Sequence, residues 1–251
     1  MRQPDNVLLA GIVGSTAYGL AGPGSDVDRL GLFATPTVTL HGLDMPTESV
    51  VSSKPDATFH EARKYCALAL GGNPTVSELM WLPGELYEVR HPLGDELIAI
   101  RAAFLSAKRT RDAYLGYATQ QFRRLEARGD GSFSADTRKR TAKHARHLLR
   151  LCSQGLELYT TGDLVIRLEN PQRYRDFGDR VAAGDVGHAR DTMARYEAAF
   201  DEGPSVLPEE PDRAVVEDWL LRVRAAYFDE AGPIAARPLG GKPSRTPGRT
   251  C

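Results

Sequence analysis

Cysteine is scarce in this sequence, long apolar segments are missing, and the charges nearly cancel. Cys66, Cys152 and Cys251 are widely spaced and odd in number, which argues against a clustered zinc site and does not suit a disulfide framework. No apolar segment reaches about 18 residues and no signal-peptide pattern is present, so we expect a cytoplasmic protein with no membrane partner. The formal net charge of −1 gives no general attraction for nucleic acid, so RNA binding would require a local basic patch.

Two kinds of pattern divide the chain. Apolar runs bounded by glycine and proline predict strands up to about residue 88, and apolar residues at helical spacing follow. The sequence therefore predicts an α+β fold with a small strand-rich domain over 1–88, a helical domain over 89–231 and a flexible basic tail over 232–251. The expected helices span roughly 92–128, 135–161, 171–182, 185–201 and 212–231, with a break at Gly129-Asp130-Gly131 and a short strand or extended arm at 164–168.

The first segment that suggests chemistry is GSTAYGLAGPGSDVDRLGLF, residues 14–33. The apolar run before it predicts a buried strand that ends at Gly14-Ser15, where backbone N–H groups and a hydroxyl could meet a phosphate. A second strand is expected over 26–33. Because side chains two residues apart on a strand point the same way, Asp26 and Asp28 should project together. Such a pair suits magnesium, which prefers oxygen ligands and accompanies nucleoside triphosphates.

The two aspartates also fit an ordinary turn, because Gly-Pro-Gly-Ser-Asp is common turn chemistry. A calcium-binding loop fails at Leu30, where an oxygen donor is needed, and at Thr37, where a bidentate glutamate is needed. A third carboxylate, Asp56, would let two metal ions bridge the attacking and leaving oxygens of a phosphoryl displacement. Pro55 excludes a regular central strand at its own position, so Asp56 is expected near a strand-to-helix transition, where it could instead cap a helix over 59–70.

A basic helix face provides further candidates. In KHARHLLRLCSQGL the apolar side chains share one side, and Lys143, His147 and Arg150 lie opposite. That face is either the solvated side of an amphipathic helix or one wall of a cleft, where Lys143 and Arg150 would meet triphosphate and His147 a base or ribose. Weaker candidates are Arg63 and Lys64 for phosphate, Glu78 as a cap or supporting residue, Trp81 as a core residue, and Tyr18 as a base-stacking ring or a loop anchor.

Three blocks of the sequence resemble a known superfamily. Gly14-Ser15, ten residues and then Asp26-x-Asp28 resemble the signature of the DNA polymerase beta nucleotidyltransferase superfamily. More narrowly, the blocks at 14–33, 56–81 and 143–168 resemble predicted nucleotidyltransferases associated with RNA repair. The resemblance spans roughly residues 7–170, and its first two blocks are the more specific ones.

The resemblance implies a small mixed sheet that carries the catalytic carboxylates, followed by a helical domain that closes the nucleotide cleft. Gly14 and Ser15 would hold the triphosphate, and the three aspartates would bind two magnesium ions. Asp56 would also help to deprotonate the attacking hydroxyl. Because this carboxylate usually lies inside a strand in the superfamily and Pro55 precedes it here, Glu61 is the substitute candidate.

The resemblance implies a magnesium-dependent nucleotidyltransferase that moves a nucleoside monophosphate from an NTP to an acceptor hydroxyl and releases pyrophosphate, and the acceptor that we expect is an RNA or tRNA end. An alternative is adenylylation of a protein or a small molecule. A third possibility is a non-catalytic nucleotide-binding or toxin-neutralising partner. That third class predicts a lost carboxylate, whereas all three are present in the sequence.

Overall fold

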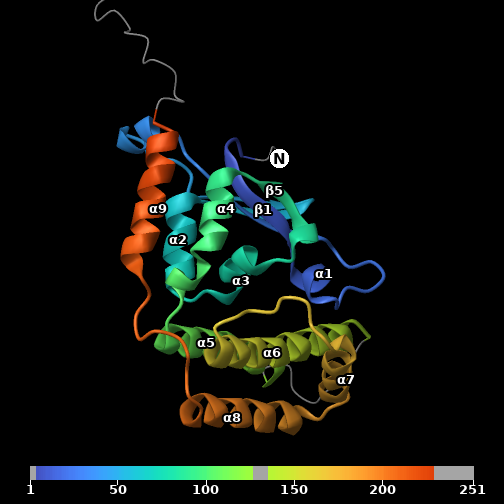
Figure 1. Ribbon diagram of the computed structural model, residues 1–251. Coiled ribbons are helices and arrows are strands. Elements are labelled where there is room, and N and C mark those ends of the chain that lie inside the picture. Colours follow the sequence, from blue (N-terminus) through green and yellow to red (C-terminus); the bar gives the residue numbers. More distant parts are fainter. Residues whose placement is uncertain (1–3, 127–134, 229–251) are drawn as a thin grey trace, which may run out of the picture.

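The computed structural model describes residues 4–126 and 135–228. Five strands form one mixed sheet in the order β3-β4-β2-β1-β5. Within it β2 and β4 are parallel neighbours, and the other neighbouring strands are antiparallel. Helices make up most of the remaining chain, so the expected α+β class is confirmed (Figure 1). The strands are β1 (Val7–Val13), β2 (Asp28–Phe33), β3 (Ser49–Ser53), β4 (Asp56–Glu61) and β5 (Tyr87–Arg90).

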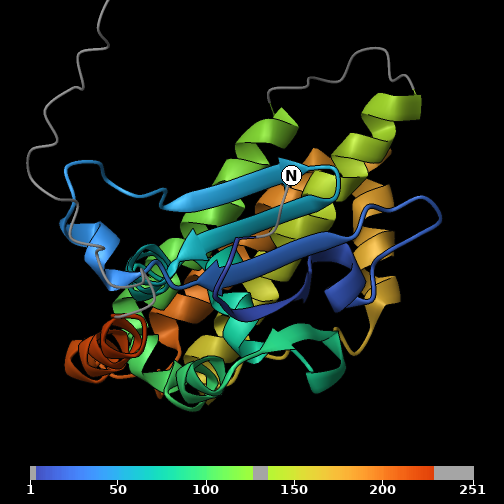
Figure 2. The same cartoon turned by 90° about the horizontal axis from the view of Figure 1, so that it is seen from above.

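The helices form two groups, one beside the sheet and one beneath it. Figure 2, seen from above, shows the strands lying across the long helices. Beside the sheet lie α2 (Ala62–Leu70), α3 (Pro74–Ser77), α4 (Pro92–Ala99) and α9 (Arg213–Ala226). The layer beneath contains α5 (Ala107–Glu126), α6 (Ala135–Thr161), α7 (Pro171–Ala182) and α8 (Val186–Glu202). Short elements complete the described chain: α1 (Gly14–Tyr18), η1 (Thr37–His41), η2 (Glu78–Trp81), η3 (Gly84–Leu86) and η4 (Arg101–Phe104).

The expected second strand begins two residues later than predicted. Pairing with β1 ends at Val13 opposite Asp28, so Asp26 lies beyond the last paired position. A turn precedes it, in which the backbone N–H of Ser25 donates to the carbonyl of Gly22 and the backbone N–H of Gly22 donates to the Ser25 hydroxyl. Asp26 therefore stands on the connection that leads into β2.

The expected position of Asp56 at a strand-to-helix transition is wrong. Asp56 is the first residue of β4, and the following helix, expected over 59–70, is Ala62–Leu70. Residues 49–61 form the antiparallel β3–β4 pair, in which Ser53 lies opposite Asp56. Pro55 lies outside both strands, as expected. Residues up to Glu61 stay extended because β4 pairs with β3 on one side and β2 on the other.

Most helix expectations agree with the structure to within a few residues. The exceptions are the segment 92–128, which is divided into α4, η4 and α5, and the last helix, which ends at Ala226. Residues 164–168 form an extended arm rather than a strand, with Leu164, Ile166 and Leu168 buried. The expected break at Gly129-Asp130-Gly131 and the expected tail over 232–251 lie outside the described residues.

The chain passes between the two helix groups twice, and the two crossings lie side by side. The first precedes α5 and the second precedes α9 (Figure 1). The backbone N–H of Ala107 donates to the carbonyl of Pro208 at 2.8 Å, and that of Asp212 donates to the carbonyl of Ala103 at 2.8 Å. After the second crossing, α9 is fixed to the sheet side by the buried indole N–H of Trp219, which donates to the carbonyl of Leu93 at 2.9 Å.

One apolar core joins the sheet to both helix groups. It includes Leu8 on β1, Leu148 on α6 and Trp219 on α9. Two helices of the part expected as the helical domain, α4 and α9, pack beside the sheet. The domain boundary near residue 88 stays a prediction. No helix among the described residues has the length and apolar character needed to cross a membrane.

Candidate active site

A cavity of about 640 Å³ lies where helix α1 and the starts of β2 and β4 face helices α5 and α6. Its lining includes all eight residues that the sequence predicts as catalytic or nucleotide-binding: Gly14, Ser15, Asp26, Asp28, Asp56, Lys143, His147 and Arg150. Further lining side chains come from α5 and α6, including Gln121, Arg124, His144 and Arg146. The cavity thus has an acidic wall from the sheet side and a largely basic wall from the helical layer.

Strand pairing explains how the carboxylates meet. Arg29 of β2 lies opposite Ala57 of β4 in a parallel register, so Asp28 and Asp56 begin neighbouring strands at the same edge of the sheet. The two carboxylates are close enough for the charge of Asp56 to act on Asp28. Burial, followed by the negative charge of Asp56 and then of Asp26, raises the pKa of Asp28, and Lys143 opposes this shift. The three aspartates share one electrostatic environment although two separate segments supply them.

Gly14 places the start of α1 against Asp28. Its φ of +69° lies in the left-handed region, which glycine adopts without steric cost. A Cβ atom at this position would lie 2.1 Å from an Asp28 carboxylate oxygen. The backbone at Gly14 therefore lies directly against the Asp28 carboxylate. Any residue with a Cβ atom at position 14 would collide with that carboxylate.

Replacing Gly14 with alanine should lower activity about a hundredfold and stability by roughly 1–2 kcal/mol. The stability cost comes from the left-handed backbone, and the activity cost from a displaced Asp28 carboxylate. Urea unfolding measures the stability, and the rate of the nucleotidyl transfer that the sequence resemblance implies measures the activity. Gly22→Ala is the control, because Gly22 lies on the connection that follows α1 and a Cβ there would meet nothing within 4 Å. Equal behaviour of the two variants would contradict the assigned contact.

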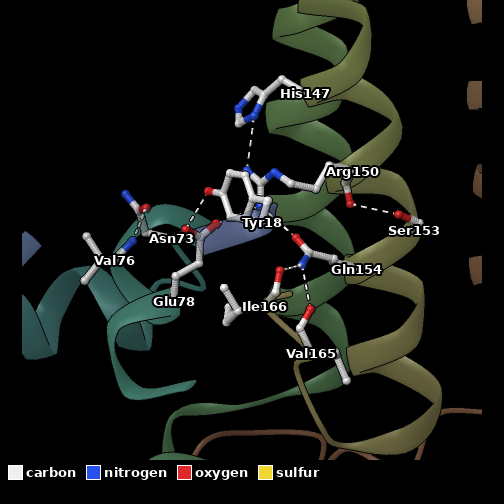
Figure 3. Close-up of polar contacts among 10 residues, drawn as sticks. All are labelled: Tyr18, Asn73, Val76, Glu78, His147, Arg150, Ser153, Gln154, Val165 and Ile166. Atoms are coloured by element: carbon white, nitrogen blue, oxygen red, sulfur yellow. Dashed lines mark hydrogen bonds and ion pairs between the residues drawn. The ribbon is translucent and has the colours of Figure 1, made fainter. Parts of the chain in front are cut away.

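Of the two alternatives for the basic face of α6, a solvated side does not hold for Arg150, which is buried and lines the cavity. Its side chain is 1% exposed and forms an ion pair with the similarly buried Glu78, with 2.7 Å between Nη1 and Oε1. The Tyr18 hydroxyl donates to the second oxygen of Glu78 at 2.6 Å, and the Tyr18 ring centroid lies 4.0 Å from the Arg150 guanidinium carbon (Figure 3). The two partners of the pair come from η2 and α6, so this buried pair links the sheet side to the helical layer.

Gln154 extends this buried group toward the arm that follows α6. Its side-chain oxygen accepts from Arg150 at 2.7 Å, and its side-chain nitrogen donates to the carbonyls of Val165 at 2.7 Å and Ile166 at 3.3 Å (Figure 3). Sequence reasoning missed Gln154 entirely and considered Glu78 only as a cap or supporting residue. The signal in the sequence was the i,i+4 pair of Arg150 and Gln154 among the leucines of α6, which marks buried polar residues that need partners.

The other weaker candidates lie outside the cavity lining, apart from Tyr18. Glu61 caps α2 and pairs with Arg224 of α9 at 2.6 Å. Arg63 and Lys64 both pair with Glu48. Trp81 is half-buried against the core, and Arg101 lies 4.3 Å above its ring. The Tyr18 ring lines the cavity but is buried and engaged with Arg150 and Glu78, a geometry that anchors the loop after Gly14-Ser15.

His147 lies between the cavity and the buried pair. Burial first, then the positive charge of Arg150, lowers its pKa to about 3. Smaller contributions in the same direction come from His144 and Lys143 on α6 and from Arg124 on α5. His147 is therefore neutral at physiological pH.

Acidification should destabilise the protein through His147. An unfolded histidine takes up a proton near pH 6.5, whereas the folded His147 does so only near pH 3. The unfolded state thus binds more protons as pH falls, and His147 should account for a loss of about 2 kcal/mol between pH 7 and pH 5. Urea unfolding of wild type and His147→Gln over this range isolates the contribution, because other titrating groups are common to both proteins. Parallel curves for the two proteins would contradict the assignment.

The donor chemistry of the acidic wall fits magnesium. Carboxylates are the hard oxygen ligands that Mg²⁺ prefers, and Mg²⁺ commonly binds through one or two carboxylates together with waters and substrate phosphates. Over 4–126 and 135–228, no three histidine, cysteine, aspartate or glutamate side chains form a group that could by itself hold a metal ion. Substrate oxygens would have to complete the coordination of any metal bound at Asp26, Asp28 and Asp56.

The mixed sheet, with aspartates at one edge beside a Gly-Ser helix start, defines a fold of the polymerase beta-like nucleotidyltransferase class. A model of the family described as "RlaP: RNA repair pathway DNA polymerase beta family" matches residues 1–172. The chain belongs to this family, and the resemblance noted in the sequence is confirmed. Comparison with curated proteins gave no match.

Proposed function

We propose that this protein transfers a nucleoside monophosphate from an NTP to the hydroxyl end of an RNA and releases pyrophosphate. The observation that supports this most strongly is the cavity shared by Gly14-Ser15, the three aspartates and the basic face of α6. A nucleoside triphosphate needs both walls, since its phosphates require positive charge and close backbone approach, and its metal ions require carboxylates. Membership of the RNA repair family supports RNA as the acceptor.

In the proposed reaction the acceptor hydroxyl attacks the α-phosphorus of the NTP. A new P–O bond forms, the bond to the β-phosphate oxygen breaks, and pyrophosphate leaves with the negative charge. Asp56, at the exposed start of β4, takes the proton of the attacking hydroxyl. Two bound magnesium ions would neutralise charge on the attacking and leaving oxygens.

The remaining residues position the substrate. The backbone and hydroxyl of Gly14-Ser15 hold triphosphate oxygens, and Lys143 provides positive charge from the exposed face of α6. Most of the expected rate enhancement comes from holding the reactants in line and neutralising charge, because phosphoryl transfer asks little covalent chemistry of the protein. Arg150, predicted from the sequence to bind triphosphate, lines the cavity and also has a buried partner in Glu78.

Transfer of label identifies the acceptor. The protein is incubated with each NTP labelled at the α-phosphate, magnesium, and either total RNA or lysate protein and metabolites. We expect label on RNA, release of pyrophosphate, and loss of both when the metal is chelated or when Asp26 is replaced by alanine. Label on a polypeptide or a small molecule would overturn RNA as the acceptor. No transfer to any acceptor, with the NTP still bound, would overturn the transferase itself.

A further inference from the structure

The contact between Arg150 and His147 fixes which ring nitrogen of His147 carries a proton. Arg150 Nη2 lies 3.1 Å from His147 Nδ1. A guanidinium has only hydrogen-bond donors, so Nδ1 must be the acceptor and must be unprotonated. In a neutral imidazole the single proton then resides on Nε2. Arg150 is itself held in place by its bonds to Glu78 and Gln154, so it cannot turn away without breaking a buried group.

Nε2 is the nitrogen available to a ligand. Figure 3 shows the His147 ring reaching out from α6, with Nδ1 toward Arg150 and the other nitrogen on the far side of the ring. His147 lines the cavity that holds Gly14-Ser15 and the aspartates. Within the described chain, the structure gives Nε2 no hydrogen-bonding partner.

We propose that Arg150 holds His147 as its Nε2–H tautomer, and that this N–H recognises an acceptor atom on the base or ribose of the bound nucleotide. This inference rests on the proposed function, because it assigns a nucleotide to the cavity. A neutral N–H gives little added attraction for phosphate over water, whereas it matches an unprotonated nitrogen or a neutral oxygen of a nucleoside. Arg150 is thus a positioning residue, and His147 is a specificity-determining one.

The charges around His147 support a neutral ring. The groups that act on it are cationic or basic from both packed elements: Lys143, His144 and Arg150 on α6, and Arg124 on α5. Their positive charge and the burial of the ring lower the pKa of His147 to about 3. Protonation would also place a second donor against the Arg150 guanidinium and destroy the existing hydrogen bond.

Nitrogen NMR tests the tautomer without any assay of activity. The full-length protein is labelled with ¹⁵N in its histidine rings, and the His147 signals are assigned by their loss in His147→Gln. We expect a protonated Nε2 and an unprotonated Nδ1, unchanged between pH 7 and pH 5. Arg150→Met should remove this preference if the variant folds. A protonated Nδ1 in the wild type, or a ring that takes up a proton near pH 6.5, overturns the proposal.

Two substitutions test recognition and leave the buried pair intact. The glutamine side-chain N–H can occupy the place of Nε2–H, whereas the shorter asparagine reaches only to the place of Nδ1. His147→Gln should keep the KM for the NTP within about threefold of wild type, and His147→Asn should raise it about tenfold with kcat little changed. Measuring both KM values with all four NTPs and with a 2′-deoxy NTP separates recognition of the base from recognition of the ribose. If His147 contacts the 2′-hydroxyl, the two variants should have equal KM values for the 2′-deoxy NTP. If it contacts the base, their KM values should differ only for the NTPs whose base carries the recognised acceptor atom.

The outcomes separate this inference from the proposed function. Equal KM values for the two variants overturn nucleotide recognition by His147 even if transfer to RNA is observed. The predicted tautomer in a protein that transfers nothing leaves Arg150 as the positioning residue but removes the transferase function. NTP binding, measured by calorimetry on the same variants, then decides whether the N–H still recognises a bound nucleotide.

Discussion

Replacing Asp28 with asparagine should lower the proposed nucleotidyl transfer by about a thousandfold or more, because the substitution would remove one of the charges proposed to bind metal beside the reacting phosphate. The folded protein should remain at least as stable as wild type. Burial and the neighbouring carboxylates raise the pKa of Asp28, so a neutral side chain is favoured at this position in the absence of metal. Initial rates with labelled NTP and thermal unfolding measure the two properties on the same preparation.

The matched control for this substitution is Asp44→Asn. Asp44 is an exposed carboxylate on the connection between β2 and β3 and does not line the cavity. It undergoes the same loss of charge and should keep wild-type activity. If Asp28→Asn retained a tenth or more of the activity while Asp44→Asn behaved as wild type, the acidic wall would not be the catalytic centre.

Breaking the buried pair of Glu78 and Arg150 should have the largest effect on stability. Either Glu78→Gln or Arg150→Met leaves one buried partner without its counter-charge, and we expect each to lower the free energy of unfolding by about 3–5 kcal/mol. Both residues are 1% exposed, so solvent cannot replace the missing partner. In the double variant the free energy of unfolding should fall by clearly less than the sum of the two single decreases, because no unpaired buried charge is left.

An exposed ion pair on the same helix provides the comparison. Arg140 and Asp136 pair across one turn of α6, with side chains 65% and 67% exposed. Asp136→Asn should cost less than about 1 kcal/mol. Urea unfolding at pH 7 of wild type, the Glu78 and Arg150 variants and Asp136→Asn measures these free energies of unfolding. Additive losses in the Glu78 and Arg150 double variant would show that the two residues stabilise the fold independently, contrary to the geometry.

Local signals in the sequence were sufficient to predict the part of the site that comes from residues 14–33. Apolar character, glycine and the spacing of Asp26 and Asp28 are properties of one short segment, and the structure places Asp28 on the strand β2 that this segment predicts. The ends of α6 likewise follow from helical spacing along a single element. In both cases the interactions that decide the structure are close together in the chain.

The errors concern residues whose environment is decided far away in the chain. Asp56 starts a strand because β4 pairs in parallel with β2, and a parallel neighbour leaves no local turn signal. For Arg150, helical spacing left a solvated face and a cleft wall as alternatives, because its partner Glu78 comes from a separate segment. Helical periodicity places a side chain on a face and does not reveal what covers that face.

The paired crossings before α5 and α9 limit how the cavity can open. A single connection would let the helical layer both twist and swing away from the sheet. The two segments, Ala103–Ala107 and Pro208–Asp212, are hydrogen-bonded side by side, so a displacement of the helical layer would have to bend both of them together. A displacement that separates η2 from α6 would also have to break the buried ion pair of Glu78 and Arg150.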